Sequence, residues 1–128
     1  MPATPRKDQT FRVQFDPATL AEDAEHSTPK ARTLLRDTVR QLDRNGIPQS
    51  QLKACEDPAR DDTKLAGCAK TYLPPPNGDW GMVFQLRLDE HGHPFLACLA
   101  FGIRHPTRSW QPSVYQIADR RLHAPSQH

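Results

Sequence analysis

Three side chains near the C-terminus have the types and spacing to do chemistry on a phosphate: Arg104, His105 and Tyr115. An arginine can hold a phosphate through two parallel hydrogen bonds, and a histidine gains or loses its proton near neutral pH. A tyrosine can stack on a base or take part in proton transfer. Cleavage of RNA through its 2′-hydroxyl needs such groups, because one must accept a proton, one must donate a proton, and a cation must stabilise the charge on phosphorus.

Each of the three residues also has a simpler structural interpretation. Tyr115 lies close to Val114 and Ile117, and a half-buried packing position fits it equally well. His105 equally fits a surface loop, and Arg104 fits a charge that ends a strand. The function of these residues therefore depends on whether the fold brings them together.

The segment that precedes them contains the clearest strand patterns in the chain. Residues 82–88 alternate in a way that gives a strand two faces, Met82, Phe84, Leu86 and Leu88 on one and Val83, Gln85 and Arg87 on the other. Residues 94–103 are nearly all apolar, which indicates a strand buried on both faces at the centre of a sheet. Residues 89–93 contain a glycine and fit the loop of a hairpin. The second strand of this hairpin leads directly to Arg104.

The first half of the chain predicts one strand and two helices. Residues 10–15 alternate between apolar and polar side chains, as a short strand does. Asp16 and Pro17 are typical of a helix start, so we expect a first helix over residues 17–26. In residues 29–44 the apolar side chains recur near the helical period, and Asn45 and Gly46 fit the end of this second helix.

The remaining segments have weaker patterns. Residues 47–63 contain prolines and a run of charges, so we expect a surface loop with one helical turn around 49–54 and a solvated acidic cluster at 56–62. Residues 64–73 have weak strand character, and residues 113–122 fit a short strand or turn that leads into a helical end. The sequence therefore predicts an α+β fold: an N-terminal strand, two helices, and then an antiparallel three- to four-stranded meander, with the helices on one face of a small sheet.

Length and composition limit the number of domains, the class of partner and the cellular compartment that we expect. The 128 residues fit one domain over residues 10–123, and we expect a disordered tail at 1–9 and a second tail at 124–128. Residues 64–128 carry a net charge of about +3, a mild basic bias compatible with a phosphate-bearing partner. Cys55, Cys68 and Cys98 lack the spacing of a zinc site or a disulfide framework, which favours a reducing cytoplasm and no metal. No apolar run fits a signal peptide or a membrane span, so we expect no membrane partner.

Short motifs in the C-terminal half follow one another in a defined order. They are Lys64-Leu65-Ala66-Gly67 with Lys70, Val83-Phe84-Gln85-Leu86, Asp89, Phe101-Gly102, Arg104-His105, Val114-Tyr115, and Ala118 with Arg120-Arg121-Leu122. In order and spacing this half resembles the RelE/ParE superfamily of toxins from bacterial toxin–antitoxin pairs. The predicted strand and two helices before the meander also agree with that family.

The resemblance implies an activity, a site and partners. It implies a metal-independent endoribonuclease that needs no cofactor and cleaves mRNA, on the ribosome, with a cognate antitoxin protein as its partner. The residues implied are Arg104, His105 and Tyr115 for catalysis and Lys70, Arg87 and Arg108 for substrate binding. Two alternatives stay open on the same fold: a ParE-like inhibitor of DNA gyrase without hydrolytic activity, and a non-toxic binding or regulatory relative.

The sequence departs from the family's pattern in three places. Nucleases of the family usually have an arginine just before the first meander strand, where this chain has Gly81 or Met82. A second basic position falls among residues 74–76, which are all proline, and the segment between Arg104 and Tyr115 is longer than usual. Loss of two phosphate-facing cations would weaken transition-state stabilisation, so a weak nuclease, a differently arranged site and an inactive relative are all open.

Overall fold

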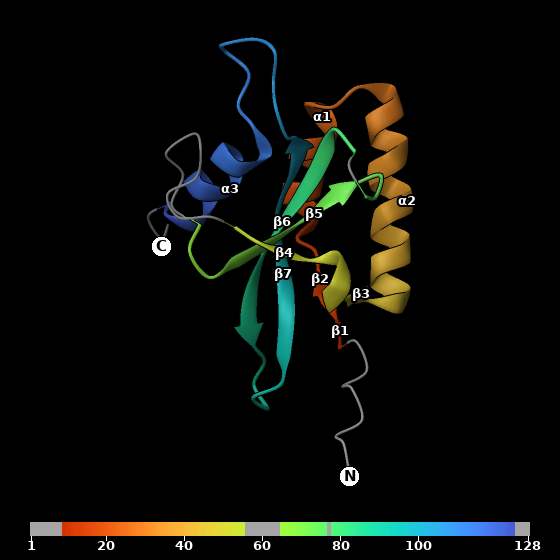
Figure 1. The fold of residues 1–128 in the computed structure, drawn as a ribbon, viewed down its shortest axis with the longest axis vertical. Coiled ribbons are helices and arrows are strands. Elements are labelled where there is room, and N and C mark those ends of the chain that lie inside the picture. The colour runs from red at the N-terminus through yellow and green to blue at the C-terminus, as the bar shows by residue number, and fades with distance from the viewer. Residues whose placement is uncertain (1–8, 56–64, 77, 125–128) are drawn as a thin grey trace.

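The computed structural model describes residues 9–55, 65–76 and 78–124. Figure 1 shows the strands and helices in these ranges. In chain order they are β1 (Thr10–Phe11), β2 (Val13–Gln14), α1 (Pro17–Glu25), α2 (Pro29–Asn45), β3 (Ile47–Pro48), a 3₁₀ turn (Gln49–Gln51), β4 (Lys53–Ala54), β5 (Cys68–Leu73), β6 (Trp80–Leu88), β7 (Pro94–Ile103) and α3 (Val114–Leu122). The acidic cluster and most of the two predicted tails lie outside the described residues.

Five strands form the main sheet, in the order β2-β7-β6-β5-β4. The strands β4 to β7 pair antiparallel in succession, whereas β2 pairs parallel with β7. The predicted α+β class, with two helices before an antiparallel meander, is confirmed. The prediction for β7 is confirmed as well, because this strand has an interior position and is buried along nearly its whole length.

Two short segments differ from the prediction. The strand expected over residues 10–15 is divided into β1 and β2, and β1 leaves the main sheet to pair antiparallel with β3. Residues 47–54, expected to be a loop with one helical turn, also contain β3 and β4. These strands are two residues long and are held by distant partners, such as Lys70 opposite Lys53, so no local alternation reveals them.

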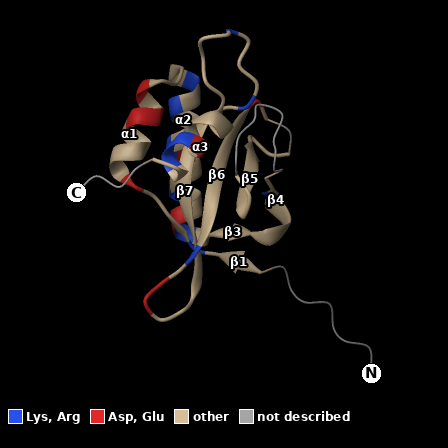
Figure 2. Ribbon diagram, turned by 90° about the vertical axis from the view of Figure 1, so that its left-hand side faces the viewer, with Lys and Arg blue, Asp and Glu red and all other residues tan. Residues whose placement is uncertain are grey.

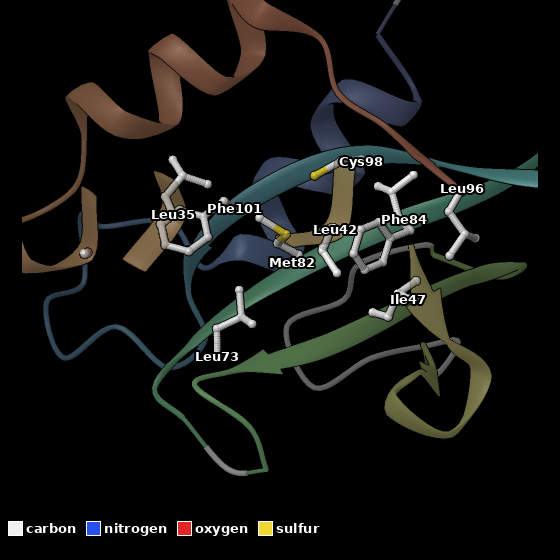
Figure 3. Packing of buried hydrophobic residues seen from close by; sticks show 11 residues of the cluster. Leu35, Leu42, Ile47, Leu73, Met82, Phe84, Leu96, Cys98 and Phe101 are labelled. Carbon is white, nitrogen blue, oxygen red and sulfur yellow. The ribbon is translucent and has the colours of Figure 1, made fainter. Parts of the chain in front are cut away.

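The two predicted helices, α1 and α2, share one face of the sheet as expected, whereas α3, expected only as a helical end, covers the opposite face. α1 and α2 pack on the face that carries Met82 and Phe84, whereas α3 packs on the face that carries Val83. Figure 3 shows the first cluster, in which side chains of β6 and β7 lie beside Leu35 and Leu42 of α2. Each face of β6 thus has its own apolar cluster, as expected from the alternation of side chains along a strand.

A β-bulge in β7 places two consecutive side chains of this strand on the face that carries α3. Val83 pairs with Ala100, but the next residue of β6, Phe84, pairs with Cys98. The extra residue, Leu99, lies with Ala100 in the cluster under α3, while Cys98 lies in the cluster under α1 and α2. A bulge of this kind places two consecutive side chains on one face.

Beyond the end of β2, side chains from α1 and α3 form hydrogen bonds with the backbone of β7 at its outer edge. Asp23 of α1 accepts a hydrogen bond from the Phe101 N–H at 2.9 Å, and Arg121 of α3 donates to the Leu99 carbonyl at 2.8 Å. The two side chains also form an ion pair with an Nη2–Oδ1 distance of 2.7 Å. Because α1 and α3 lie on opposite faces, this pair ties the two helical layers together around the sheet edge.

The surface carries charges of both signs and one protruding hairpin. Figure 2 shows acidic positions on α1 and on the turn that joins β6 to β7. This hairpin extends past the helices in Figure 1, and its residues Leu86 and Leu88 are exposed. None of the helices within the described ranges combines the length and apolar character needed to cross a bilayer.

Candidate functional site

A cleft of about 610 Å³ opens on the face of the sheet that carries α3, between β5, the segment 104–113 and the start of α3. Five of the six predicted site residues line this cleft, which are Lys70, Arg104, His105, Arg108 and Tyr115. Among the described residues that line it, the charged side chains include three permanent cations and no carboxylate. A concave site with this charge pattern favours an anionic ligand.

Arg104 is held rigidly in the cleft wall. Its Nη1 donates to the Gly78 carbonyl at 2.8 Å, and its Nε donates to the Tyr115 hydroxyl at 3.3 Å. Its guanidinium carbon lies 3.4 Å from the ring centroid of Tyr72, a stacked cation–π contact. A guanidinium has five N–H donors, so donors beyond these two bonds can serve a phosphate without movement of the side chain.

Gly81 provides the space in which Arg104 lies. In the sheet, Gly81 is paired with Tyr72 on one side and Gly102 on the other. A Cβ atom built on Gly81 would lie 3.1 Å from Cγ of Arg104, tighter than ordinary packing allows. The side chain of Arg104 thus passes over Gly81, one of the two positions at which the resemblance leads one to expect an arginine. Met82, the other candidate position, is buried in the cluster under α1 and α2.

The site extends across β4 and β5 through Lys53, Lys70 and Tyr72, and Lys70 lies near Tyr115 of α3. Lys53 lies directly opposite Lys70, and its Nζ is 4.4 Å from the ring centroid of Tyr72. The Nζ of Lys70 is 5.1 Å from the ring centroid of Tyr115 and 5.8 Å from that of Tyr72. Like charges directly opposite each other are unfavourable in a sheet, and the aromatic rings offset part of this repulsion.

Tyr115 is both a packing residue and a member of the cleft, the two interpretations that the sequence leaves open. Its ring packs against the apolar cluster under α3, while its hydroxyl bonds to Arg104 in the cleft. Its position is fixed by the start of the helix, where the side chain of Ser113 accepts from the N–H of Gln116 and the side chain of Gln116 accepts from the N–H of Ser113. This capping box sets the first turn of α3 and therefore the direction of the tyrosine.

His105 and Arg108 lie at the open side of the cleft, and both are exposed. The guanidinium of Arg108 is 5.9 Å from the ring centroid of Trp110. Arg87 does not line the cleft: its Nε donates to Oε1 of Gln85 at 2.9 Å on the exposed part of β6. The structure thus brings five of the predicted residues to one site and leaves Arg87 outside it.

Tyr72 and Lys53 were not identified from the sequence. Because side chains alternate along β5, Lys70 and Tyr72 lie on one face, so recognition of this strand in the sequence would also have identified Tyr72 as a site residue. Lys53 depends on the pairing of β4 with β5, which no local pattern predicts.

Burial keeps the cysteine in the cleft wall, Cys55, mainly in its thiol form at neutral pH. Burial, and to a smaller extent neighbouring Cys68, raise the pKa of Cys55 to about 11, although Lys70 opposes this. The thiol form therefore predominates at neutral pH, and a thiol is a far weaker nucleophile than a thiolate. In the described part of the chain, no group of three or more His, Cys, Asp and Glu side chains could hold a metal ion.

The sequence matches no protein-family model, and it matches no curated protein.

Proposed function

We propose that this protein is a RelE-like toxin, an endoribonuclease that cleaves mRNA on the ribosome without a metal ion. The observation that carries the proposal is the cleft itself, in which Arg104, Lys70 and Arg108 meet two tyrosine rings and no carboxylate among the described lining residues. Cations bind the phosphates of a single strand, and aromatic rings stack on its bases. The order of elements, a strand and two helices before the meander, also supports the proposal.

In this proposal the cleavage uses the RNA's own 2′-hydroxyl as nucleophile. The 2′-oxygen attacks the adjacent phosphorus and the bond to the 5′-oxygen breaks, which leaves a 2′,3′-cyclic phosphate and a 5′-hydroxyl. Arg104, fixed by the Gly78 carbonyl and the Tyr115 hydroxyl, stabilises the charge that develops on the phosphate oxygens. His105, at the mouth of the cleft, takes the proton from the 2′-hydroxyl as the base, and a proton from solvent neutralises the departing 5′-oxygen.

The other residues in the cleft, with Lys53 beside it, hold the strand. Lys70 and Lys53 bind flanking phosphates, and Tyr72 and Tyr115 offer ring surface to the bases. Because free RNA is flexible, presentation by the ribosome supplies the extended strand that such a shallow positive site needs. A cognate antitoxin that covers the cations would keep the protein inactive in the cytoplasm.

The proposal is tested with purified protein, ribosomes and a defined mRNA. Arg104→Ala should lower the cleavage rate by about 10²- to 10³-fold, as loss of one transition-state donor does in other enzymes. Arg87→Ala is the matched control, since it removes the same charge from the same sheet outside the cleft, and it should change the rate by no more than about twofold.

Equal losses of cleavage rate in Arg104→Ala and Arg87→Ala would contradict the proposed site. Growth arrest that survives both Arg104→Ala and Tyr115→Phe would contradict the roles proposed for these two residues. Inhibition of DNA supercoiling with intact mRNA would favour the gyrase alternative.

A further inference from the structure

Cys55 and Cys68 face each other across the pair of strands β4 and β5. The register pairs Lys53 with Lys70 and Ala54 with Ala69, so the next residue, Cys55, comes opposite Cys68. The N–H of Cys55 donates to the Cys68 carbonyl at 3.1 Å, which shows that the pairing continues to this position. Residues directly opposite in an antiparallel pair have side chains on the same face.

The Cα spacing of this arrangement suits a disulfide. Residues opposite each other in antiparallel strands have Cα atoms about 4.5–5.5 Å apart, within the range of about 4.4–6.8 Å that disulfides span. Their Cβ atoms are also about 4.5–5.5 Å apart, so the strands must close slightly to bring these atoms to the distance of about 3.5–4.5 Å found in a disulfide. Cys68 is buried in the apolar cluster under α3, and half-buried Cys55 packs against the same cluster. Cys98 lies in the cluster on the opposite face of the sheet, so it is not a competing partner.

We propose that Cys55 and Cys68 are an oxidative modification site, which a small-molecule disulfide such as glutathione disulfide converts to an intramolecular disulfide in the wall of the cleft. Cys55 lines the cleft of about 610 Å³ and is the cysteine that a small reagent can reach. Cys68, behind it in the cluster, is placed to resolve the intermediate.

The reaction proceeds in two exchange steps. The ionised fraction of Cys55, which is small at neutral pH and grows as pH rises, attacks one sulfur of glutathione disulfide, forms a mixed disulfide and releases one glutathione, which takes up the proton that Cys55 lost. The sulfur of Cys68 then attacks the sulfur of Cys55, forms the Cys55–Cys68 bond and releases the second glutathione with the second proton. The protein loses two hydrogens and two electrons, and one glutathione disulfide becomes two glutathione thiols.

The cross-link would fasten β4, a strand of two residues, to β5. It would close the chain around positions 56–67 and hold Lys53 opposite Lys70 at the edge of the cleft. A disulfide around a loop of this length restricts the unfolded chain, so the melting temperature of the oxidised protein should rise by roughly 5–10 °C. This modification does not depend on the proposed nuclease activity.

The test incubates the folded full chain with glutathione disulfide above neutral pH and stops the exchange with acid. The remaining thiols are then alkylated with N-ethylmaleimide in urea, which exposes buried Cys98. Trypsin should then release residues 54–60 joined to residues 65–70, a product that disappears on reduction, while residues 88–104 carry alkylated Cys98. Cys98→Ala is the matched control and should form the same product, whereas Cys55→Ser should not. The melting temperature should rise on oxidation in the wild type and in Cys98→Ala but not in Cys55→Ser.

Three results would overturn the proposal. They are a glutathione adduct on Cys55 that persists without resolution, links that involve Cys98 or a second chain, and full alkylation of all three cysteines after oxidation. Cys55→Ser should fold, because the side chain it changes is only half-buried. Each of these outcomes can therefore be read on folded protein.

Discussion

The ion pair between Asp23 and Arg121 should be the most consequential polar contact of the fold, and Asp23→Ala removes it. The Asp23 side chain is 3% exposed and accepts two bonds from Arg121, at 2.7 and 3.0 Å, besides the one from the Phe101 N–H. Burial alone would lower the pKa of Arg121, but the hydrogen bond and charge of Asp23 outweigh burial and raise it. Arg121 is therefore charged at neutral pH.

The expected loss follows from what the substitution leaves behind. Removal of one partner of a buried ion pair costs about 3–5 kcal/mol, because the other charge stays buried. Arg121 keeps its bonds to the Leu99 carbonyl and to Glu22, so we expect the lower end, about 3 kcal/mol. The free energy of unfolding of a domain is about 5–15 kcal/mol, so this one substitution removes a large share of it.

Urea unfolding, followed by far-UV circular dichroism and by the fluorescence of Trp80 and Trp110, measures this loss. Glu22→Gln is the matched control, since Glu22 bonds to the same Arg121 at 3.0 Å but its side chain is 63% exposed. An exposed pair contributes about 0–1 kcal/mol, so the control should stay near the wild type. Equal effects of the two substitutions, or a loss below about 1 kcal/mol for Asp23→Ala, would refute the role of the pair at the edge of β7.

Three further outcomes follow from the cleft and the hairpin. Gly81→Ala should displace Arg104 and weaken RNA binding in filter or fluorescence titrations while circular dichroism shows the fold retained. Tyr72→Leu removes the ring under the Arg104 guanidinium and should weaken RNA binding by roughly two- to fivefold, as loss of an exposed cation–π contact does. Hydrogen bonds from the backbone N–H groups of His93 and His91 lower the pKa of Asp89, with the bond from His93 the larger cause. The side chain therefore stabilises the folded protein above the ordinary carboxyl pKa of 3.8, so the stability difference between wild type and Asp89→Ala in urea titrations should shrink as pH falls below that value.

Local signals explain the part of the fold that the sequence predicts. Asp16 caps α1 as its position before Pro17 indicates, because its side chain accepts from the N–H of Ala18 at 3.0 Å. The alternation of β6 and the apolar run of β7 mark two long strands that pair with each other. Such patterns depend on residues close together in the chain, so they are visible without the structure.

Long-range contacts explain what the sequence does not predict. β3 and β4 exist only through pairing with β1 and β5, and Lys53 enters the site through that pairing. α3 packs on the face opposite α1, with Arg121 reaching round the edge of β7 to Asp23, and sequence spacing alone does not specify a face. The direction of Arg104 depends on a glycine in a neighbouring strand, which is a matter of sheet register.

Identification of the RNA ends tests the central claim most directly. Ribosomes that carry a defined mRNA are incubated with the purified protein, and the new ends are analysed chemically. A nuclease that uses the 2′-hydroxyl, with Arg104 at the phosphate, should leave 2′,3′-cyclic phosphate and 5′-hydroxyl ends that become far fewer with Arg104→Ala and stay at the wild-type level with Arg87→Ala. Intact mRNA, or 5′-phosphate ends produced by attack of water, would contradict it.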